Sequence, residues 1–557
     1  MPSTDIPLSL MSPSCLSSSS RDSSSLNSIN NGERQLTVTT PKDGMVTLQD
    51  NNMTSSARPL MAEGSRSHLT LGGKGLKELD VGEEGGSSSS SVSEGHKLGW
   101  IVSALFIVAD MVGGGVVAMP VAFVKSGLIG GIVFMVVIAA IFLYTGYQLG
   151  VVWNIMQERW PQYHEHCRKP FPEIAKRSMG PHAKKFTSLL VNVTLFGICV
   201  VYLLLSSQIA HYFADRYLHE SNFKISYCQM IVILAVLLSP FTYLKSPADF
   251  WPVIVLAMAT TTLAVIAIIT GVIRDSEICM VESQLPEPST TTVITTIGTF
   301  LFAFSGHYVF PTIQHDMREP KKFSRSVSLG FLFVVLLYMP LSIVSFMVYG
   351  DSLVTSVIYS VQTEELQLGA NAMIAVHCIL TLVIVINPIN QEVEEFFKVA
   401  HHFGRGRFTV RTVVLCLVVF VALTVPDFLP VMNVVGSSTI PLGCVVLPSL
   451  FYLYINAAEE YEWQKNQLPR FMDVIRRTKK TTLLLNAFIL CLAVLMGVLG
   501  TWLAIEEMQA ASFSSTPCYL QPFLGGNSTI DHSAGGHGVA QQCCGKYRNI
   551  SSFAQCQ

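Results

Sequence analysis

The sequence predicts an all-α polytopic membrane protein with 11 transmembrane helices. Half of its 557 residues are hydrophobic and only 13% are charged, and the mean hydropathy is +0.45. A soluble chain carries nearly twice that share of charged residues. Apolar runs of about 20 residues, the length that an α-helix needs to cross a bilayer, recur along the chain. The net charge of −2 gives no reason to expect a nucleic acid as partner.

Two of the apolar runs are interrupted near their centres. The first run contains "ADMVGGGVVAMP", and the sixth reads "TFLFAFSGHYVFPTIQHDM". In both, a glycine stands five residues before a proline: Gly115 before Pro120, and Gly306 before Pro311. Matched breaks five segments apart predict a 5+5 inverted repeat with broken helices 1 and 6, plus one extra helix.

The chain divides into three predicted regions. Residues 1–96 are rich in serine and too poor in apolar residues to fold, so we expect a disordered cytosolic tail. Residues 97–504 form the transporter domain, and residues 505–557 form an extracellular or luminal tail that contains cysteines. The predicted spans are 98–123, 127–152, 187–213, 227–244, 249–272, 291–314, 327–349, 369–390, 410–426, 429–455 and 481–504.

Loop charge predicts which side of the membrane each end faces. The loops after spans 2, 6, 8 and 10 are rich in Lys and Arg, and the loops between them are not, which places the N-terminus in the cytosol. The C-terminal tail then lies outside, where the sequons at Asn527 and Asn549 are expected to be glycosylated. Cys228 and Cys279, at the outer ends of spans 4 and 5, are the candidate partners of a disulfide.

The broken helices suggest what the protein binds. Unwound backbone at membrane depth is tolerated where it lines a cavity or is buried in protein. Free amides at a helix N-terminus suit a carboxylate, and carbonyls at a C-terminus suit an ammonium. A zwitterionic amino acid offers both groups. The alternative is that the glycines and prolines only kink the helices, as they often do in membrane proteins.

Three stretches resemble the amino acid/auxin permease family: "VGGGVVAMPVAFVKSG" (112–127), "FGICVVYLLLSSQ" (196–208) and "FAFSGHYVFPTIQHDMREPKKF" (302–323). The resemblance covers roughly residues 97–504. It implies the fold of the amino acid–polyamine–cation group and coupled transport of a solute with a cation. Sodium-coupled relatives carry an asparagine four residues before the first signature glycine, where this chain has Ala109. Protons are therefore the expected coupling ion, with sodium less favoured.

The candidate substrate-binding residues are those of the two breaks. The resemblance adds one aromatic residue as a gate over the site, for which ordinary packing is the alternative. The full set is Gly113, Gly114, Gly115, Phe304, Ser305, Gly306, His307 and Tyr202.

The candidates for the coupling ion are Asp110, His307 and Thr381. An ionised carboxylate near mid-membrane is costly, so Asp110 should pair, titrate or face water, unless it only caps the break. His307 is of a residue type that titrates near neutral pH, although a neutral structural histidine is the alternative. Thr381 stands four residues after His377 on one helix face, and both could look onto span 1 or pack in the core.

The favoured function is a secondary active transporter of small neutral amino acids, coupled to protons. The alternatives are a sodium-coupled or vesicular amino acid transporter, or a transporter-like amino acid sensor. We expect no enzyme, because no catalytic constellation appears, and no cofactor or metal, because "HEHC" lacks a second ligand cluster. The acidic pairs Glu394–Glu395 and Glu459–Glu460 should be solvated. The expected partners are an amino acid, protons and membrane lipids, in the plasma membrane or an endolysosomal or vesicular membrane.

Overall fold

The structure is a computed structural model that describes residues 97–165, 167–217, 225–243, 251–280, 285, 287–353, 356–399, 404–514, 517–520 and 544. The predicted tail 1–96, the sequons at Asn527 and Asn549 and the short loop between spans 4 and 5 lie outside these residues. Within them the chain is helical, and the one bridge between extended residues joins Leu98 to Met317.

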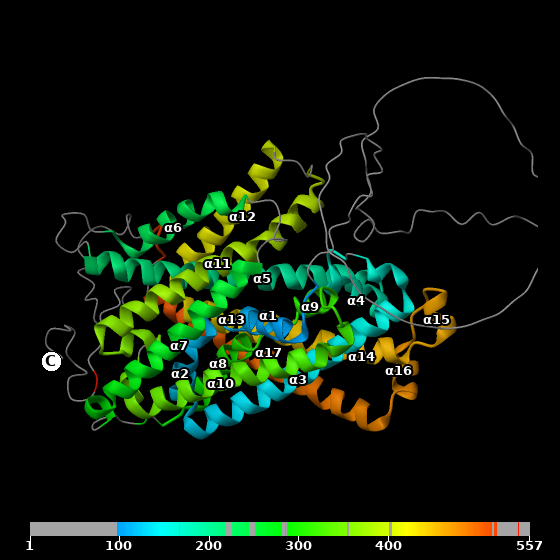
Figure 1. Cartoon of the computed structure of the whole chain (residues 1–557), viewed down its shortest axis with the longest axis horizontal. Coiled ribbons are helices and arrows are strands. Elements are labelled where there is room, and N and C mark those ends of the chain that lie inside the picture. The colour runs from blue at the N-terminus through cyan, green and yellow to red at the C-terminus, as the bar shows by residue number, and fades with distance from the viewer. Residues whose placement is uncertain are drawn as a thin grey trace, which may run out of the picture. The chain divides into compact units, whose positions relative to one another are not determined.

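Figure 1 shows the helices packed side by side. Their bounds are α1 Trp100–Met111, α2 Gly115–Ser126, α3 Leu128–Arg159, α4 Pro170–Met179, α5 Pro181–Tyr217, α6 Tyr227–Thr242, α7 Trp251–Cys279, α8 Thr290–Ala303, α9 Phe310–His315, α10 Phe323–Tyr349, α11 Glu364–Phe396, α12 Arg405–Thr424, α13 Phe428–Ile440, α14 Leu447–Ala457, α15 Glu460–Gln464, α16 Phe471–Arg477 and α17 Lys480–Ser514. The π-helix η8, Pro441–Val446, joins α13 to α14, and the short 3₁₀ turns are η2 Pro161–His164, η5 Pro320–Lys322, η6 Gly350–Ser352 and η7 Val357–Ser360.

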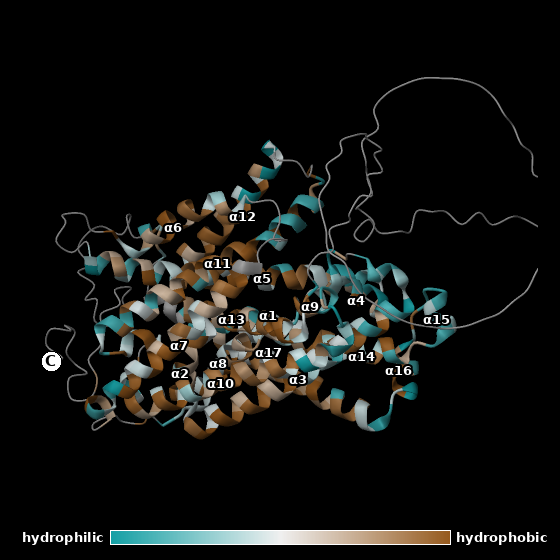
Figure 2. Cartoon of the chain, in the orientation of Figure 1, coloured by the Kyte–Doolittle hydropathy of each residue, from teal (hydrophilic) through white to brown (hydrophobic). Residues whose placement is uncertain are grey.

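The helices confirm the predicted fold class. In the described part of the chain, 8 helices are long and apolar enough to cross a membrane, and the bent pair α1–α2 makes up to 9. The shorter apolar helices α6 and α8 occupy two further predicted spans, and α9 completes the broken sixth span. Hydrophobic residues dominate the long helices, whereas polar residues gather on α4, α15 and α16 (Figure 2).

The two broken spans lie side by side and run in opposite directions. Leu98, before α1, exchanges backbone hydrogen bonds with Asp316 and Arg318, which follow α9 (2.9 and 2.8 Å). At the other end, the Thr292 hydroxyl of α8 donates to the Lys125 carbonyl of α2 (3.4 Å). The start of one span therefore meets the end of the other, as an inverted repeat requires.

The last helix extends ten residues beyond its predicted end, to Ser514. Glu507 on this extension forms an ion pair with Lys125 at the end of α2 (3.1 Å). Its other carboxylate oxygen accepts a hydrogen bond from the Asn433 amide of α13 (3.1 Å). Hydropathy alone predicts that the helix ends before Glu506 and Glu507. Hydropathy does not take into account that a charged side chain can be paired with residues on neighbouring helices.

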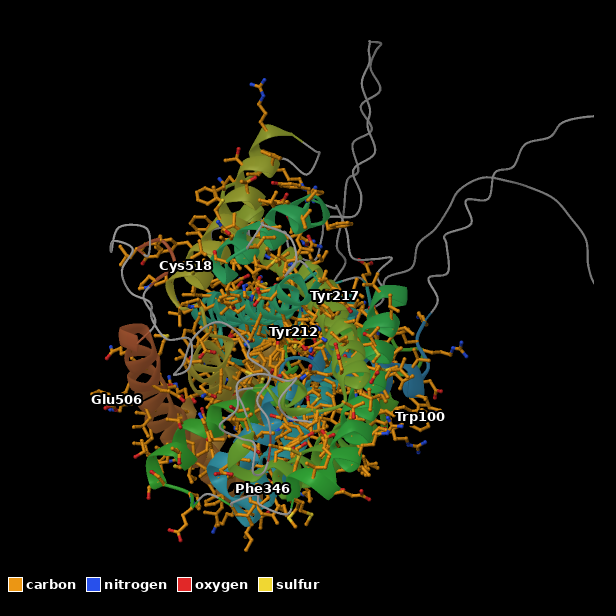
Figure 3. The ribbon with its side chains drawn as sticks, turned by 90° about the vertical axis from the view of Figure 1, so that its left-hand side faces the viewer. Trp100, Tyr212, Tyr217, Phe346, Glu506 and Cys518 are labelled. Carbon is orange, nitrogen blue, oxygen red and sulfur yellow. A yellow bond between two sulfur atoms is a disulfide. The ribbon has the colours of Figure 1, made fainter. Side chains whose placement is uncertain are left out.

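The predicted pairing of Cys228 with Cys279 is wrong. Cys228 is bonded to Cys518, and Cys279 is bonded to Cys544. Two cysteines on the same side of the membrane can still be far apart in the membrane plane. Here α6 packs on α5, α11 and α12, whereas α7 packs on α1, α10 and α11. The chain beyond α17 returns to the end of α12, where the Cys518 amide donates to the Leu423 carbonyl at 2.9 Å (Figure 3).

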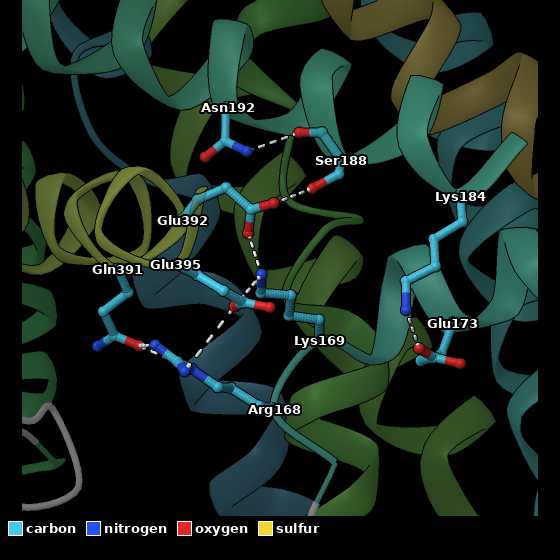
Figure 4. Close-up of polar contacts among 9 residues, drawn as sticks. All are labelled: Arg168, Lys169, Glu173, Lys184, Ser188, Asn192, Gln391, Glu392 and Glu395. Carbon is cyan, nitrogen blue, oxygen red and sulfur yellow. Dashed lines mark hydrogen bonds and ion pairs between the residues drawn. The ribbon is translucent and has the colours of Figure 1, made fainter. Parts of the chain in front are cut away.

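A polar cluster joins the start of α4 and α5 to the end of α11 (Figure 4). Lys169 forms ion pairs with Glu392 and with Glu395, the latter at 2.6 Å. Arg168 lies 3.9 Å from the Glu395 carboxylate, and the Ser188 hydroxyl donates to Glu392 at 2.6 Å. Exposed pairs of this kind add little stability one by one, but together they fix how α5 and α11 lie at this end.

Glu394 is not solvated as its pattern predicted; it is buried. The guanidinium groups of Arg411 and Arg407 lie 2.6 and 3.4 Å from its carboxylate. Arg411 also donates to the Thr242 carbonyl at the end of α6 (2.6 Å). Because a buried carboxylate needs paired charges, this cluster ties α6, α11 and α12 together.

Candidate functional site

The first break separates α1, which ends at Met111, from α2, which begins at Gly115. The axes of the two helices differ by 63°. Because α2 starts here, its first amide groups have no carbonyl partner within the helix. The break therefore presents backbone donors at the depth where the chain crosses the membrane.

Neighbouring side chains close tightly around Gly113. A β-carbon at this position would overlap the Tyr202 hydroxyl of α5 and would lie 3.1 Å from His377 Nε2 of α11. Tyr202 is almost fully buried, and its ring packs edge-on against His377 with centroids 6.2 Å apart. The structure thus places Tyr202 directly against the break.

The other two glycines differ in the room around them. At Gly115 a β-carbon would lie 2.9 Å from the backbone of Ala303, at the end of α8. At Gly114 the nearest atom would be 3.7 Å away, which is ordinary van der Waals contact. Gly115 is therefore required for the close approach of α2 to α8, whereas Gly114 has space.

Asp110 lies between the two breaks. A β-carbon on Gly306 would be 2.6 Å from Asp110 Oδ2, so the carboxylate rests against the second break. Asp110 is partly exposed, and within the described ranges its side chain has no hydrogen bond or ion pair. An unpaired carboxylate at this depth is costly unless it binds a cation or a proton.

His307 in the second break points toward α3. Its Nε2 lies 2.9 Å from the Phe142 carbonyl and 3.0 Å from the Thr145 hydroxyl, which assigns the hydrogen to Nε2. The ring is fully buried and stacks on Phe310, with centroids 4.7 Å apart. These contacts anchor the second break to α3.

The remaining predicted residues of the second break use their side chains for packing. Phe304 is fully buried against Phe331 and Tyr338 of α10. The Ser305 hydroxyl donates to the Phe302 carbonyl (2.8 Å). Gly306 has φ +157°, which L side chains rarely adopt. Only backbone groups of this segment are therefore placed to bind a solute.

His377 and Thr381 lie together behind the first break. His377 Nδ1 donates to the Ala257 carbonyl of α7 at 3.0 Å, which leaves Nε2 to accept from the Thr381 hydroxyl at 3.3 Å. The same Nε2 approaches Gly113. The three candidates for the coupling ion therefore have different surroundings. Asp110 lies against Gly306, Thr381 contacts His377, and His307 is bonded to α3.

Two further residues reach the breaks from other elements, and no local sequence pattern indicates them. The Tyr338 hydroxyl of α10 donates to the Met111 carbonyl at the first break, at 3.3 Å, and lies 3.5 Å from the Ala303 carbonyl at the second. Cys444 of η8 is fully buried, and its thiol lies near the backbone of Gly306 and His307. A π-helix often marks a functional site, but neither contact leaves a local sequence pattern.

Comparison with known proteins places this arrangement in a family. The family model described as "Transmembrane amino acid transporter protein" matches residues 96–503. The chain belongs to this family of amino acid transporters. The predicted family resemblance is thereby confirmed, and the protein is a multi-pass integral membrane protein.

Curated relatives in Arabidopsis thaliana are similar over much of this chain. Amino acid transporter AVT1E is 24% identical over 60% of this chain and 63% of its own length. Amino acid transporter AVT1D is 26% identical over 71% of this chain and 67% of its own length. Lysine histidine transporter-like 1 is 24% identical over 68% of this chain and 85% of its own length.

Two solved structures are similar at 12% sequence identity. The inward-facing conformation of Mhp1 has a TM-score of 0.42 and covers 76% of this chain and 92% of its own. MhsT in complex with L-phenylalanine has a TM-score of 0.45 and covers 72% of this chain and 98% of its own.

Proposed function

We propose that this amino acid transporter moves small neutral amino acids together with protons. The observation that carries the proposal is the unpaired Asp110 carboxylate between two helix breaks. Backbone amides at the start of α2 would receive the substrate carboxylate, and carbonyls around the second break would receive its ammonium.

The geometry around the glycines limits the size of the substrate. Tyr202 and His377 lie against Gly113, and Ala303 lies against Gly115. At Gly114 a β-carbon would be in ordinary van der Waals contact, 3.7 Å from its nearest neighbours, so the backbone there has room beside it for about one methyl group. A short side chain fits such a site better than a long one.

The chemistry of the break favours a proton over sodium. A carboxylate without a cation at membrane depth is most simply neutralised by binding a proton. Ala109 stands where sodium-coupled relatives carry an asparagine, and a methyl group cannot ligate sodium. Sodium coupling is the second candidate. It is supported by the Thr381 hydroxyl, which is hydrogen-bonded to His377 Nε2, the nitrogen that approaches Gly113.

Loop charge and the disulfides support one orientation. Cys228 begins α6, Cys279 ends α7, and their partners follow α17, so all four lie on one side. Disulfides persist in oxidising compartments, which supports an extracellular or luminal position for this side and a cytosolic N-terminus. The basic loops at the opposite ends of the helices agree with that orientation. The same argument fits the plasma membrane and an endolysosomal or vesicular membrane.

The test is uptake into proteoliposomes of the purified full-length protein. We expect a small neutral amino acid such as alanine to accumulate when the outside is acidified, and to do so equally in sodium and in choline. Ionophore that collapses the pH gradient should abolish accumulation. A strict sodium requirement would refute proton coupling, and binding without any uptake would instead support a sensor.

A further inference from the structure

A cavity of about 220 Å³ lies between α3 and α17, against α8 and the π-helix η8. Its lining is wholly apolar and comes from four elements: α3, α8, the π-helix η8 and α17. Phe134, Leu301, Pro441 and Ala493 represent these elements in turn. A cavity of this kind does not hold water, and smaller ones of ~150 Å³ bind benzene.

Contacts fix α17 to the bundle on both sides of the cavity. On one side, the Gln148 amide of α3 donates to Asn486 of α17 at 2.8 Å. On the other side, Gly500 of α17 packs against Ser437, where a β-carbon would lie 2.9 Å from the hydroxyl. The cavity-lining residues of α17 all fall between Asn486 and Gly500.

The mouth of the cavity faces the bilayer. Val133 and Val137 both line the cavity and expose 51% and 42% of their surface. The surrounding face of α17 is also apolar and exposed, with Phe488 and Leu495 at 65% and 55%. At this depth the medium outside the protein is hydrocarbon, so a chain of methylene groups can enter without leaving its own environment.

We propose that this cavity is a binding site for one acyl chain of a membrane phospholipid. A flexible chain suits a lining with no polar partner, since it needs no hydrogen bond inside the cavity.

The bound acyl chain would also stabilise the elements that contact the second break. Phe142 lines the cavity, and its carbonyl is the one that accepts the hydrogen bond from His307. Leu301 lines the cavity and lies three residues before Phe304, where α8 ends. Filling the cavity therefore fixes the two elements that hold the second break in place, whatever solute the transporter carries.

The experiment uses the full-length protein in nanodiscs that contain phosphatidylcholine with a photoactivatable diazirine at the middle of one acyl chain. After irradiation and digestion, mass spectrometry counts the label on each helix. We expect residues 133–142 and 489–496 to carry at least fivefold more label than α7, whose Leu263 and Ile266 are exposed but line neither this cavity nor the one beside α6.

Ala493→Phe fills the cavity and should lower its labelling at least fivefold, whereas Leu495→Phe, on the exposed face of the same helix, should not. If Ala493→Phe is not monodisperse, Val133→Phe blocks the mouth instead. Uniform labelling of all exposed helices, or labelling unchanged by both filling variants, would overturn the proposal. Labelling of the cavity by a diazirine sterol and not by the phospholipid would overturn the acyl-chain assignment. The labelling by either lipid is measured without any transport assay.

Discussion

The two breaks have the same spacing in the sequence but are held open in different ways. At the first break, between Met111 and Gly115, the glycines have no side chains, and the segment takes its shape from Tyr202, His377 and Ala303 on neighbouring helices. The second break is fixed by one of its own side chains: His307 is hydrogen-bonded to the Phe142 carbonyl of α3 and stacks on Phe310.

This difference suggests a division of labour. A segment without side chains can change its contacts at little cost, whereas a buried, hydrogen-bonded histidine resists displacement. We infer that the first break adapts to the solute while the second serves as a fixed reference. The Asp110 carboxylate, which lies on the first span and contacts the second break, links the two.

The largest effect is expected for Gly306→Ala. The new methyl group would lie 2.6 Å from the Asp110 carboxylate, on a backbone that L side chains rarely adopt. We expect transport to fall roughly 50-fold from strain and displacement of the carboxylate. Initial uptake rates in proteoliposomes measure it. Gly369→Ala is the matched control, because nothing lies within 4 Å of its β-carbon; equal rates for both variants would show that the second break is not rigid.

Asp110→Asn should uncouple the transporter. One pH unit is worth 1.36 kcal/mol, so a one-unit gradient concentrates a neutral solute about tenfold at one proton per solute. The variant should lose that tenfold accumulation and keep exchange of labelled for unlabelled solute. Counterflow and gradient-driven uptake are measured on the same vesicles. If accumulation survives, Asp110 only caps the break and the proton binds elsewhere.

Gly113→Ala should have a moderate effect that can be reversed. Its methyl group would overlap the Tyr202 hydroxyl, the far end of a side chain that can move. Overpacking of about 1 kcal/mol corresponds to roughly fivefold slower transport. Tyr202→Phe in the same chain should restore much of the rate by removing the overlapping atom. No recovery would mean that Gly113 acts through its backbone and not through the space beside Tyr202.

Gly114→Ala should change the rate by less than about twofold, because its β-carbon would meet only ordinary contacts. Gly114→Val is the sharper probe, since its branched side chain would project into the space that we assign to the solute. Comparing the apparent affinities of the two variants for the solute alanine separates loss of space from loss of folding. A large loss of transport rate in Gly114→Ala would contradict the geometry described for the first break.

Thr145→Val should be the mildest change to the second break. It removes the hydroxyl that lies 3.0 Å from His307 Nε2 but leaves the stronger contact with the Phe142 carbonyl. Loss of one such hydrogen bond lowers stability by about 1 kcal/mol. Thermal unfolding of the detergent-purified protein measures the shift, and unchanged stability would show that His307 is held by Phe142 alone.

Hydropathy and helix-breaking residues were enough to predict the spans and both breaks, because these depend on local sequence. Sequence could not predict the residues that reach the breaks from other helices. Tyr338 and Cys444 lie in ordinary apolar runs, and their roles arise only from packing against Met111, Ala303 and Gly306. Phe304 shows the converse: it belongs to the break, but its side chain packs into α10.

The two disulfides set the order in which the protein matures. Cys518 and Cys544 both follow α17, so neither bond can form until every membrane helix has been synthesised. The bonds then close rings of chain with sequence separations of 290 and 265 residues. A chain that ends before Cys518 therefore leaves both Cys228 and Cys279 without the partners that they have in the structure.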